Sequence, residues 1–113
     1  MFPFKEDARK LFTSPRFIEY CRERGLDARE AAQLAVLLAT CHHYGKGDAY
    51  AGFQLNEWLL SGSAGYIIRL LEKAGCPESI ARKVRLIRRA SVLFAAIPPE
   101  LLDITEEVLE EER

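Results

Sequence analysis

The sequence predicts an all-α fold: a compact bundle of six or seven short-to-medium helices in a single domain. Three observations predict this class. Helix start and stop signals recur at short intervals along the 113 residues. Apolar residues between these signals recur at helical spacing, and no segment alternates polar and apolar residues as a half-buried strand does. A chain of this length forms one domain, and its 49% hydrophobic content is normal for a globular protein.

The first two predicted helices have clear boundaries. A short helix is expected over 4–12. Ser14 then caps a second helix, and Pro15 occupies its first position, where the missing N–H removes no hydrogen bond. Gly25 ends this second helix, because glycine readily takes the left-handed conformation that commonly follows a helix C-terminus.

The third predicted helix is the most apolar one. Asp27 and Glu30 form the pattern of a capping box at its start, and the helix extends to about Tyr44. After Glu30 it is apolar on nearly every side. Such a helix is typical of the middle of a bundle.

Three further helices follow at regular intervals. Asp48 can cap a fourth helix that ends near 61–62, and Ser63 can cap a fifth. The Gly-Cys-Pro segment at 75–77 ends the fifth helix and starts a sixth, which is expected over about 77–96 and is ended by two prolines.

The chain ends in an acidic segment. A last helix begins near Pro99 or Asp103, and residues 100–113 carry seven carboxylates and one arginine, a balance of −6. Residues 1–99 carry fifteen bases and ten acids, a balance of +5. We therefore expect a helical core over 1–99 and an acidic C-terminal helix over 100–113 that packs on it or trails from it. Such a charge asymmetry indicates charged binding partners or ion pairs within the molecule, and it does not indicate a particular fold.

The most informative feature is an arginine face on the helix predicted at about 77–96. At 100° per residue, four arginines fall within about 120° of arc, while apolar residues occupy the far side. They are Arg82, Arg85, Arg88 and Arg89. The planar guanidinium suits phosphate oxygens, and residues 65–97 carry seven bases against two acids. One interpretation is a contact with the phosphate backbone of DNA or RNA. The other is a solvated face, or one neutralised by the acidic last helix or by an acidic partner.

The turn at 75–77 also permits a helix-turn-helix interpretation, in which Glu78, Ser79 and Arg82 would meet base edges. Leu71 is bulky where such motifs take a small residue, and the following helix is long. An ordinary helical hairpin is therefore favoured.

Cys41, His42 and His43 form the one chemically suggestive cluster. Adjacent histidines on a helix point about 100° apart, so they cannot both ligate one metal, and none of the paired spacings of zinc sites occurs. We therefore predict no metal and no cofactor, and we interpret the histidines as favourable charges at a helix C-terminus. A site assembled in space with Cys21 and Cys76 has no support from spacing.

Five aromatic residues at helical spacing have two interpretations, core packing or a surface that binds a partner. Core packing is favoured. The five are Tyr20, Tyr50, Phe53, Trp58 and Tyr66.

The expected cellular location and the lack of a predicted enzyme activity both follow from sequence patterns that are absent. The three cysteines show no disulfide framework, the N-terminus carries no apolar stretch like a signal peptide, and the longest near-apolar run, 31–41, is too short to cross a bilayer. We expect a cytoplasmic protein with no membrane partner. No serine, cysteine or carboxylate has a recognisable catalytic partner, so no catalytic residue and no enzyme are predicted.

The function predicted from these observations is that of a small binding or assembly subunit. Its expected partners are a DNA or RNA backbone, another protein, or a second copy of itself. By class alone, and with no shared motif, it resembles the small helical accessory subunits of nucleoprotein complexes, such as those of CRISPR effector complexes. The alternative is a structural or regulatory interaction module whose arginine face pairs with its own acidic tail or with an acidic partner.

Overall fold

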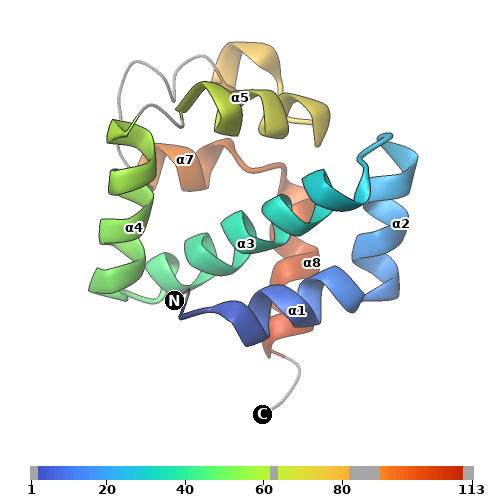
Figure 1. Cartoon of the computed structure of the whole chain (residues 1–113), viewed down its shortest axis with the longest axis horizontal. Helices are drawn as coiled ribbons and strands as arrows, with labels where there is room; N and C mark the ends of the chain where they lie inside the picture. Colours follow the sequence, from blue (N-terminus) through green and yellow to red (C-terminus); the bar gives the residue numbers. More distant parts are fainter. Residues whose placement is uncertain (1–2, 62–63, 82–89, 111–113) are drawn as a thin grey trace.

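The computed structural model describes residues 3–61, 64–81 and 90–110, and among them it contains helices and no strand. This confirms the all-α prediction (Figure 1). The helices are α1 (Lys5–Thr13), α2 (Pro15–Glu23), α3 (Ala28–Gly45), α4 (Ala49–Leu60), α5 (Ala64–Lys73), α7 (Ala90–Ala96) and α8 (Pro99–Glu110).

The number of helices is slightly higher than expected. Residues 78–81 are also helical, so the described chain holds eight helical segments rather than six or seven. The difference arises in the stretch expected as one helix over about 77–96. It is helical at both described ends, 78–81 and Ala90–Ala96, and residues 82–89 between them lie outside the described residues.

Three of the predicted caps are present, and the fourth, Ser63, lies outside the described residues. Asp27 and Glu30 form both hydrogen bonds of a capping box, at 2.8 and 3.0 Å. The Ser14 hydroxyl oxygen accepts from the backbone N–H of Phe17 at the start of α2, and Asp48 accepts from two backbone N–H groups at the start of α4. Each cap satisfies N–H groups that the first helical turn leaves without a partner, which explains why these helices begin where they do.

The turn from α2 to α3 depends on Gly25. This residue has φ 68°, the left-handed conformation predicted for it. The turn lets the Leu26 N–H donate to the Cys21 carbonyl at 3.0 Å, which closes the end of α2.

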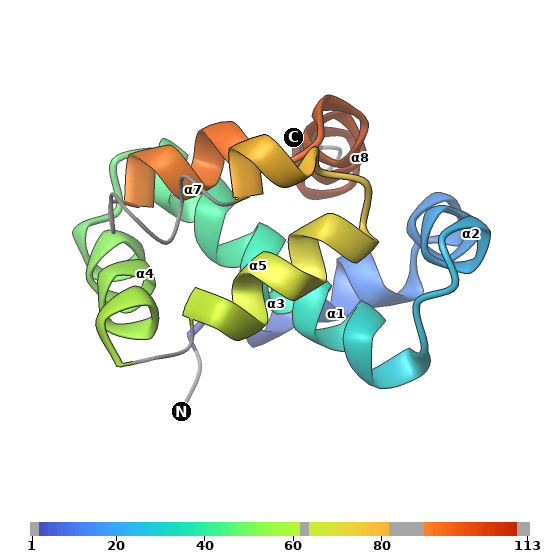
Figure 2. The ribbon, with the colours of Figure 1, turned by 90° about the horizontal axis from the view of Figure 1, so that it is seen from above.

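Helix α3 is the centre of the molecule, as its composition predicted. It packs against α1, α4, α7 and α8, and Figures 1 and 2 show it crossing the middle of the fold. Eight of its residues are buried: Ala31, Leu34, Ala35, Leu37, Leu38, Ala39, Thr40 and Cys41. A helix surrounded on several sides needs apolar residues on several sides, which is why α3 lacks the single apolar stripe of a surface helix.

Helix α8 packs against α1, α2 and α3. Leu101 and Ile104 are buried in the common core, and Thr105 is buried with its hydroxyl donating to the Leu101 carbonyl at 2.7 Å. The acidic helix is thus an integral part of the described fold. None of the described helices has both the length and the apolar content needed to cross a bilayer.

Candidate functional site: the acidic helix and the groove beside it

The four arginines predicted to bind phosphate, Arg82, Arg85, Arg88 and Arg89, lie outside the described residues. The structure does describe the acidic helix that was considered as their partner. The positions of its carboxylates show which of them already pair with other bases.

One row of carboxylates on α8 faces α2. Glu100 and Glu107 lie seven residues apart and so project from the same side of the helix. Glu107 pairs with Arg16, and Glu100 lies 3.4 Å from the Arg24 guanidinium. Arg16 lies on α2 and Arg24 directly follows its last residue, so this segment neutralises one side of the acidic helix.

Arg24 is held in place by more than its carboxylate partner. Its guanidinium carbon lies 3.5 Å from the centroid of the Tyr20 ring, a cation–π contact. Tyr20 is buried and its hydroxyl donates to the backbone carbonyl of Ala74. This contact links α2 to the end of α5 and orients Arg24 toward α8.

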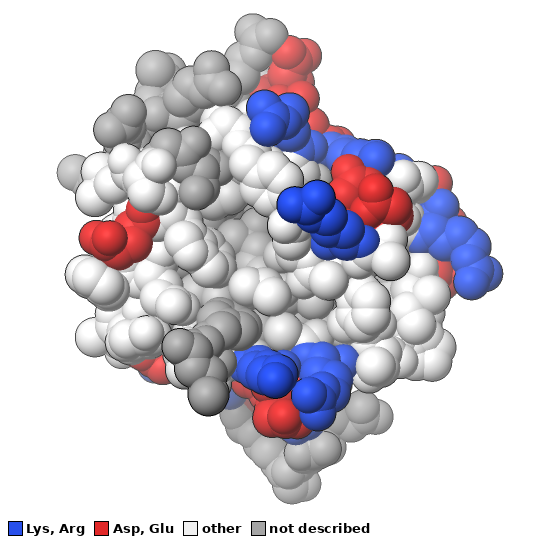
Figure 3. Space-filling model, viewed as in Figure 1, with Lys and Arg blue, Asp and Glu red and all other residues white. Residues whose placement is uncertain are grey.

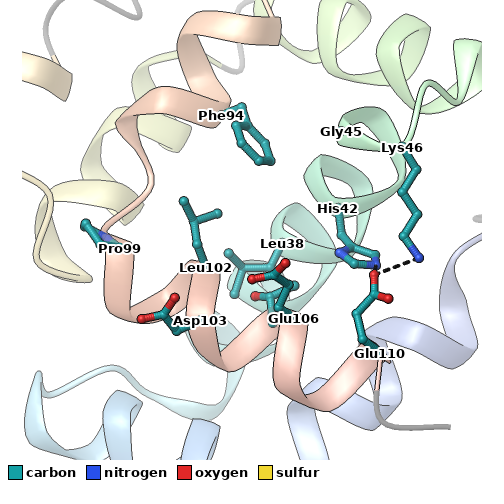
Figure 4. Close-up of a pocket in the computed structure, with 11 residues that line it drawn as sticks. Leu38, His42, Gly45, Lys46, Phe94, Pro99, Leu102, Asp103, Glu106 and Glu110 are labelled. Atoms are coloured by element: carbon teal, nitrogen blue, oxygen red, sulfur yellow. Dashed lines mark ion pairs between the residues drawn. The ribbon is translucent and has the colours of Figure 1, made fainter. Parts of the chain in front are cut away.

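A second row of carboxylates on α8 lines a groove. Asp103, Glu106 and Glu110 recur at three- and four-residue spacing, and Figure 4 shows Glu110 beside His42 and Lys46 and Asp103 on the opposite side of Glu106. Glu110 lies 2.9 Å from the Lys46 ammonium and 3.2 Å from His42 Nε2. Within the described part of the chain, Asp103 and Glu106 form no ion pair.

The groove has a volume of about 380 Å³ and an apolar floor. Leu38 of α3 is fully buried beneath it, and Phe94 of α7 and Leu102 of α8 are partly buried along its sides. Gly45 lets the Phe94 ring pack closely against the end of α3, because a Cβ there would make a tight contact with the ring at 3.3 Å. The groove therefore combines an apolar floor with a carboxylate rim.

His42 lies at the end of the groove beside Glu110, and its side chain is only 10% exposed. Burial lowers the pKa of His42, the Lys46 ammonium lowers it further, and Glu110 acts in the opposite direction. The imidazole is therefore neutral at pH 7, and among the residues that the structure describes this end of the groove carries the Lys46 ammonium beside the Glu110 carboxylate.

His43 faces a different helix from its neighbour. Its Nε2 lies 2.5 Å from an Asp7 carboxylate oxygen, and its ring stacks on Phe4 with centroids 4.1 Å apart. The rings of His42 and His43 are nearly perpendicular, at 85°. One histidine thus contacts α8 and the other contacts α1. Among the described residues, no group of three or more histidine, cysteine or acidic side chains is placed to hold a metal ion.

The three cysteines are buried free thiols in the described structure. Burial raises the pKa of Cys21 to about 11 and raises the pKa values of Cys41 and Cys76 as well. Thiols that stay protonated at neutral pH are poor nucleophiles and poor metal ligands.

The buried neutral state of His42 predicts how stability depends on pH. Because folding lowers the pKa of His42 below its ordinary value of 6.5, the unfolded chain takes up a proton more readily than the folded protein as the pH falls. The contribution of neutral His42 to the free energy of unfolding is complete above the pKa that His42 has in the unfolded chain. It is lost as the pH falls toward the lower pKa of His42 in the folded protein. In urea titrations, wild type should lose more free energy of unfolding than His42→Gln between about pH 7.5 and about pH 5.5. Asp7, His43 and Glu110 are present in both proteins, so equal losses would contradict this role of His42.

The aromatic residues divide between core and surface. Tyr20 is buried and Trp58 packs partly against the core, as predicted. The core prediction is wrong for Tyr50, Phe53 and Tyr66, which are 52%, 60% and 38% exposed. The inner side of α4 is filled by smaller aliphatic residues such as Leu55, so Tyr50 and Phe53 project from its outer side.

The groove beside α8 was not predicted from the sequence. Its carboxylates could have been grouped by their helical spacing, since Asp103, Glu106 and Glu110 share one side of a helix and Glu100 and Glu107 another. No sequence signal placed Phe94 or Leu38 opposite them, because that depends on how three helices pack.

Comparison with known protein families, with curated proteins and with solved structures finds no match for this chain.

Proposed function

We propose that this protein is a non-enzymatic binding and assembly subunit that contacts the phosphate backbone of a nucleic acid through Arg82, Arg85, Arg88 and Arg89. The observation that carries the proposal is the pairing of the acidic helix. Three of the five carboxylates of α8 pair with Arg16 of α2, with Arg24 just after α2 and with Lys46 just after α3.

This pairing bears on the choice between the two interpretations of the arginine face. If the acidic tail were the partner of the arginines, its carboxylates would need to be available to them. Glu107 is engaged by Arg16, Glu100 by Arg24 and Glu110 by Lys46. Among the described carboxylates of α8, this leaves Asp103 and Glu106 without an ion-pair partner, which is too few to neutralise four guanidinium groups. On one side of the helix predicted from the sequence, four guanidinium groups would repel one another unless an anion lay near, and a polyphosphate chain supplies several anions.

The assembly part of the proposal is supported by α4. Only one of its twelve residues is charged, and its outer side presents Tyr50, Phe53 and Leu60, each at least half exposed. Figure 3 shows that the surface over α4 is largely uncharged, whereas Lys and Arg side chains gather elsewhere on the same face. Exposed apolar surface of this kind marks contacts with other proteins.

The proposal is tested by the salt dependence of nucleic-acid binding by the full chain. Four phosphate contacts release counterions, so affinity should fall about 50- to 150-fold between about 50 and about 200 mM salt, with the smaller loss for single strands. Fluorescence anisotropy with labelled single-stranded DNA, single-stranded RNA and duplex DNA measures this slope. Absence of binding to all three at low salt would contradict the proposal and favour a protein-interaction module whose arginines meet an acidic protein.

A further inference from the structure

We propose that the groove between α3, α7 and α8 binds a small amphiphilic amine, a protonated ammonium group attached to an apolar body. This site rests on described residues and is independent of the proposed nucleic-acid contact. Its ligand follows from the shape of the groove, from its floor and from the charges at its two ends.

The floor selects an apolar body. Leu38, Phe94 and Leu102 supply aliphatic and aromatic surface from three different helices. The volume of about 380 Å³ lies within the range of small-molecule sites, which combine an apolar lining with a few polar groups that orient the ligand. Burial of an alkyl or aryl group here would contribute in proportion to the area removed from water.

The charges select a cation and place it at one end. Asp103 and Glu106 lie on the rim with no ion-pair partner among the residues that the structure describes. At the other end Glu110 already has the Lys46 ammonium at 2.9 Å, and His42 is held neutral by burial. A ligand ammonium is therefore attracted to the end formed by Asp103 and Glu106 and repelled by Lys46.

The same ion pair limits the length of the ligand. Lys46 follows the end of α3 and Glu110 lies on α8, so their contact bridges the two walls of the groove (Figure 4). A long helix of a partner protein could not pass through this bridged end without breaking the pair. A short amine fits the remaining space, with its apolar body over Leu102 and its nitrogen at the rim.

The test uses three probes of equal length: hexylammonium, 1-hexanol and hexanoate. Titration of the full chain, followed by NMR shifts of the Leu38 and Leu102 methyl groups, should show saturable binding of hexylammonium. The affinity for 1-hexanol should be lower by a factor of at most about five, because a solvent-exposed ion pair adds only modest affinity. Hexanoate should not bind, because its carboxylate is repelled by the carboxylates of the rim. Absence of saturable shifts with hexylammonium would overturn the proposal.

Two matched double variants separate a site from general attraction to an acidic helix. Asp103→Asn with Glu106→Gln should weaken hexylammonium binding about fivefold, whereas Glu100→Gln with Glu107→Gln should leave it within about twofold. Both pairs remove two charges from α8, but the second pair faces α2 and does not line the groove. Equal weakening by both pairs, in proteins shown to be folded by circular dichroism, would overturn the proposal.

Discussion

Arg85→Glu combined with Arg89→Glu is expected to abolish measurable binding of nucleic acid by the full chain. The two substitutions change the summed charge of the four-arginine face from +4 to zero, so the counterion release that drives binding is lost. Affinity at low salt should fall by about 100-fold or more, and the dependence on salt should largely disappear. Both positions lie opposite the apolar side of the predicted helix, so circular dichroism should show an unchanged helical content.

The matched control is Arg9→Glu combined with Arg22→Glu. It changes the net charge by the same amount at two exposed residues of α1 and α2, whose ion-pair partners among the described residues are the nearby Glu6 and Glu19. Binding should weaken only a few-fold through the general field of the protein. If this control abolished binding as thoroughly as the first pair, the effect would come from net charge, and the assignment to the four arginines would be wrong.

Deletion of residues 100–113 is a poor substitute for these charge variants. The deletion would expose the arginines only if the acidic tail covered them, and it would also remove Leu101 and Ile104 from the core. Loss of two fully buried aliphatic side chains destabilises a small domain by several kcal/mol, about 2–5 for each such truncation to alanine. A change in affinity could then reflect unfolding rather than release of the arginines.

Leu34→Ala is expected to lower the free energy of unfolding by about 2–5 kcal/mol. Leu34 is fully buried on α3, which packs against α1, α4, α7 and α8, so the cavity left behind would lie at the centre of the fold. Urea denaturation followed by circular dichroism measures the change, which would be a large part of the total stability of a domain this size.

The matched control is the same substitution at a surface position. Leu60 on α4 is 60% exposed, and Leu60→Ala should change the free energy of unfolding by no more than about 0.5 kcal/mol. Equal losses at both positions would mean that α3 is not the centre of the core. They would also mean that the outer side of α4 is already covered in solution, for example by a second copy of the chain.

The helix boundaries could be predicted because they depend on local interactions. Asp27 and Glu30 are three residues apart, and the Ser14 hydroxyl bonds an amide three residues ahead. Such bonds form within one helical turn, whatever the rest of the molecule does. The central position of α3 was also predictable, because an all-round apolar helix has to be surrounded.

The surface of α4 could not be predicted in the same way. Its apolar residues occupy both sides, so helical periodicity does not say which side faces the core. Packing against α3 through Leu55 and Leu59 decides this, and Tyr50 and Phe53 are left on the outer side.

Local signals in the sequence thus establish an all-α chain, the ends of its first four helices and the presence of one acidic segment. Only the packing of those helices decides where the acidic charges go. Arg16 and Glu107 pair across 91 residues of sequence, and His42 and His43, adjacent in the chain, contact different helices. An ion pair between distant residues needs both helices to be in place before its two charges can meet. No local pattern encodes that position, and the groove beside α8 arises from the same long-range packing.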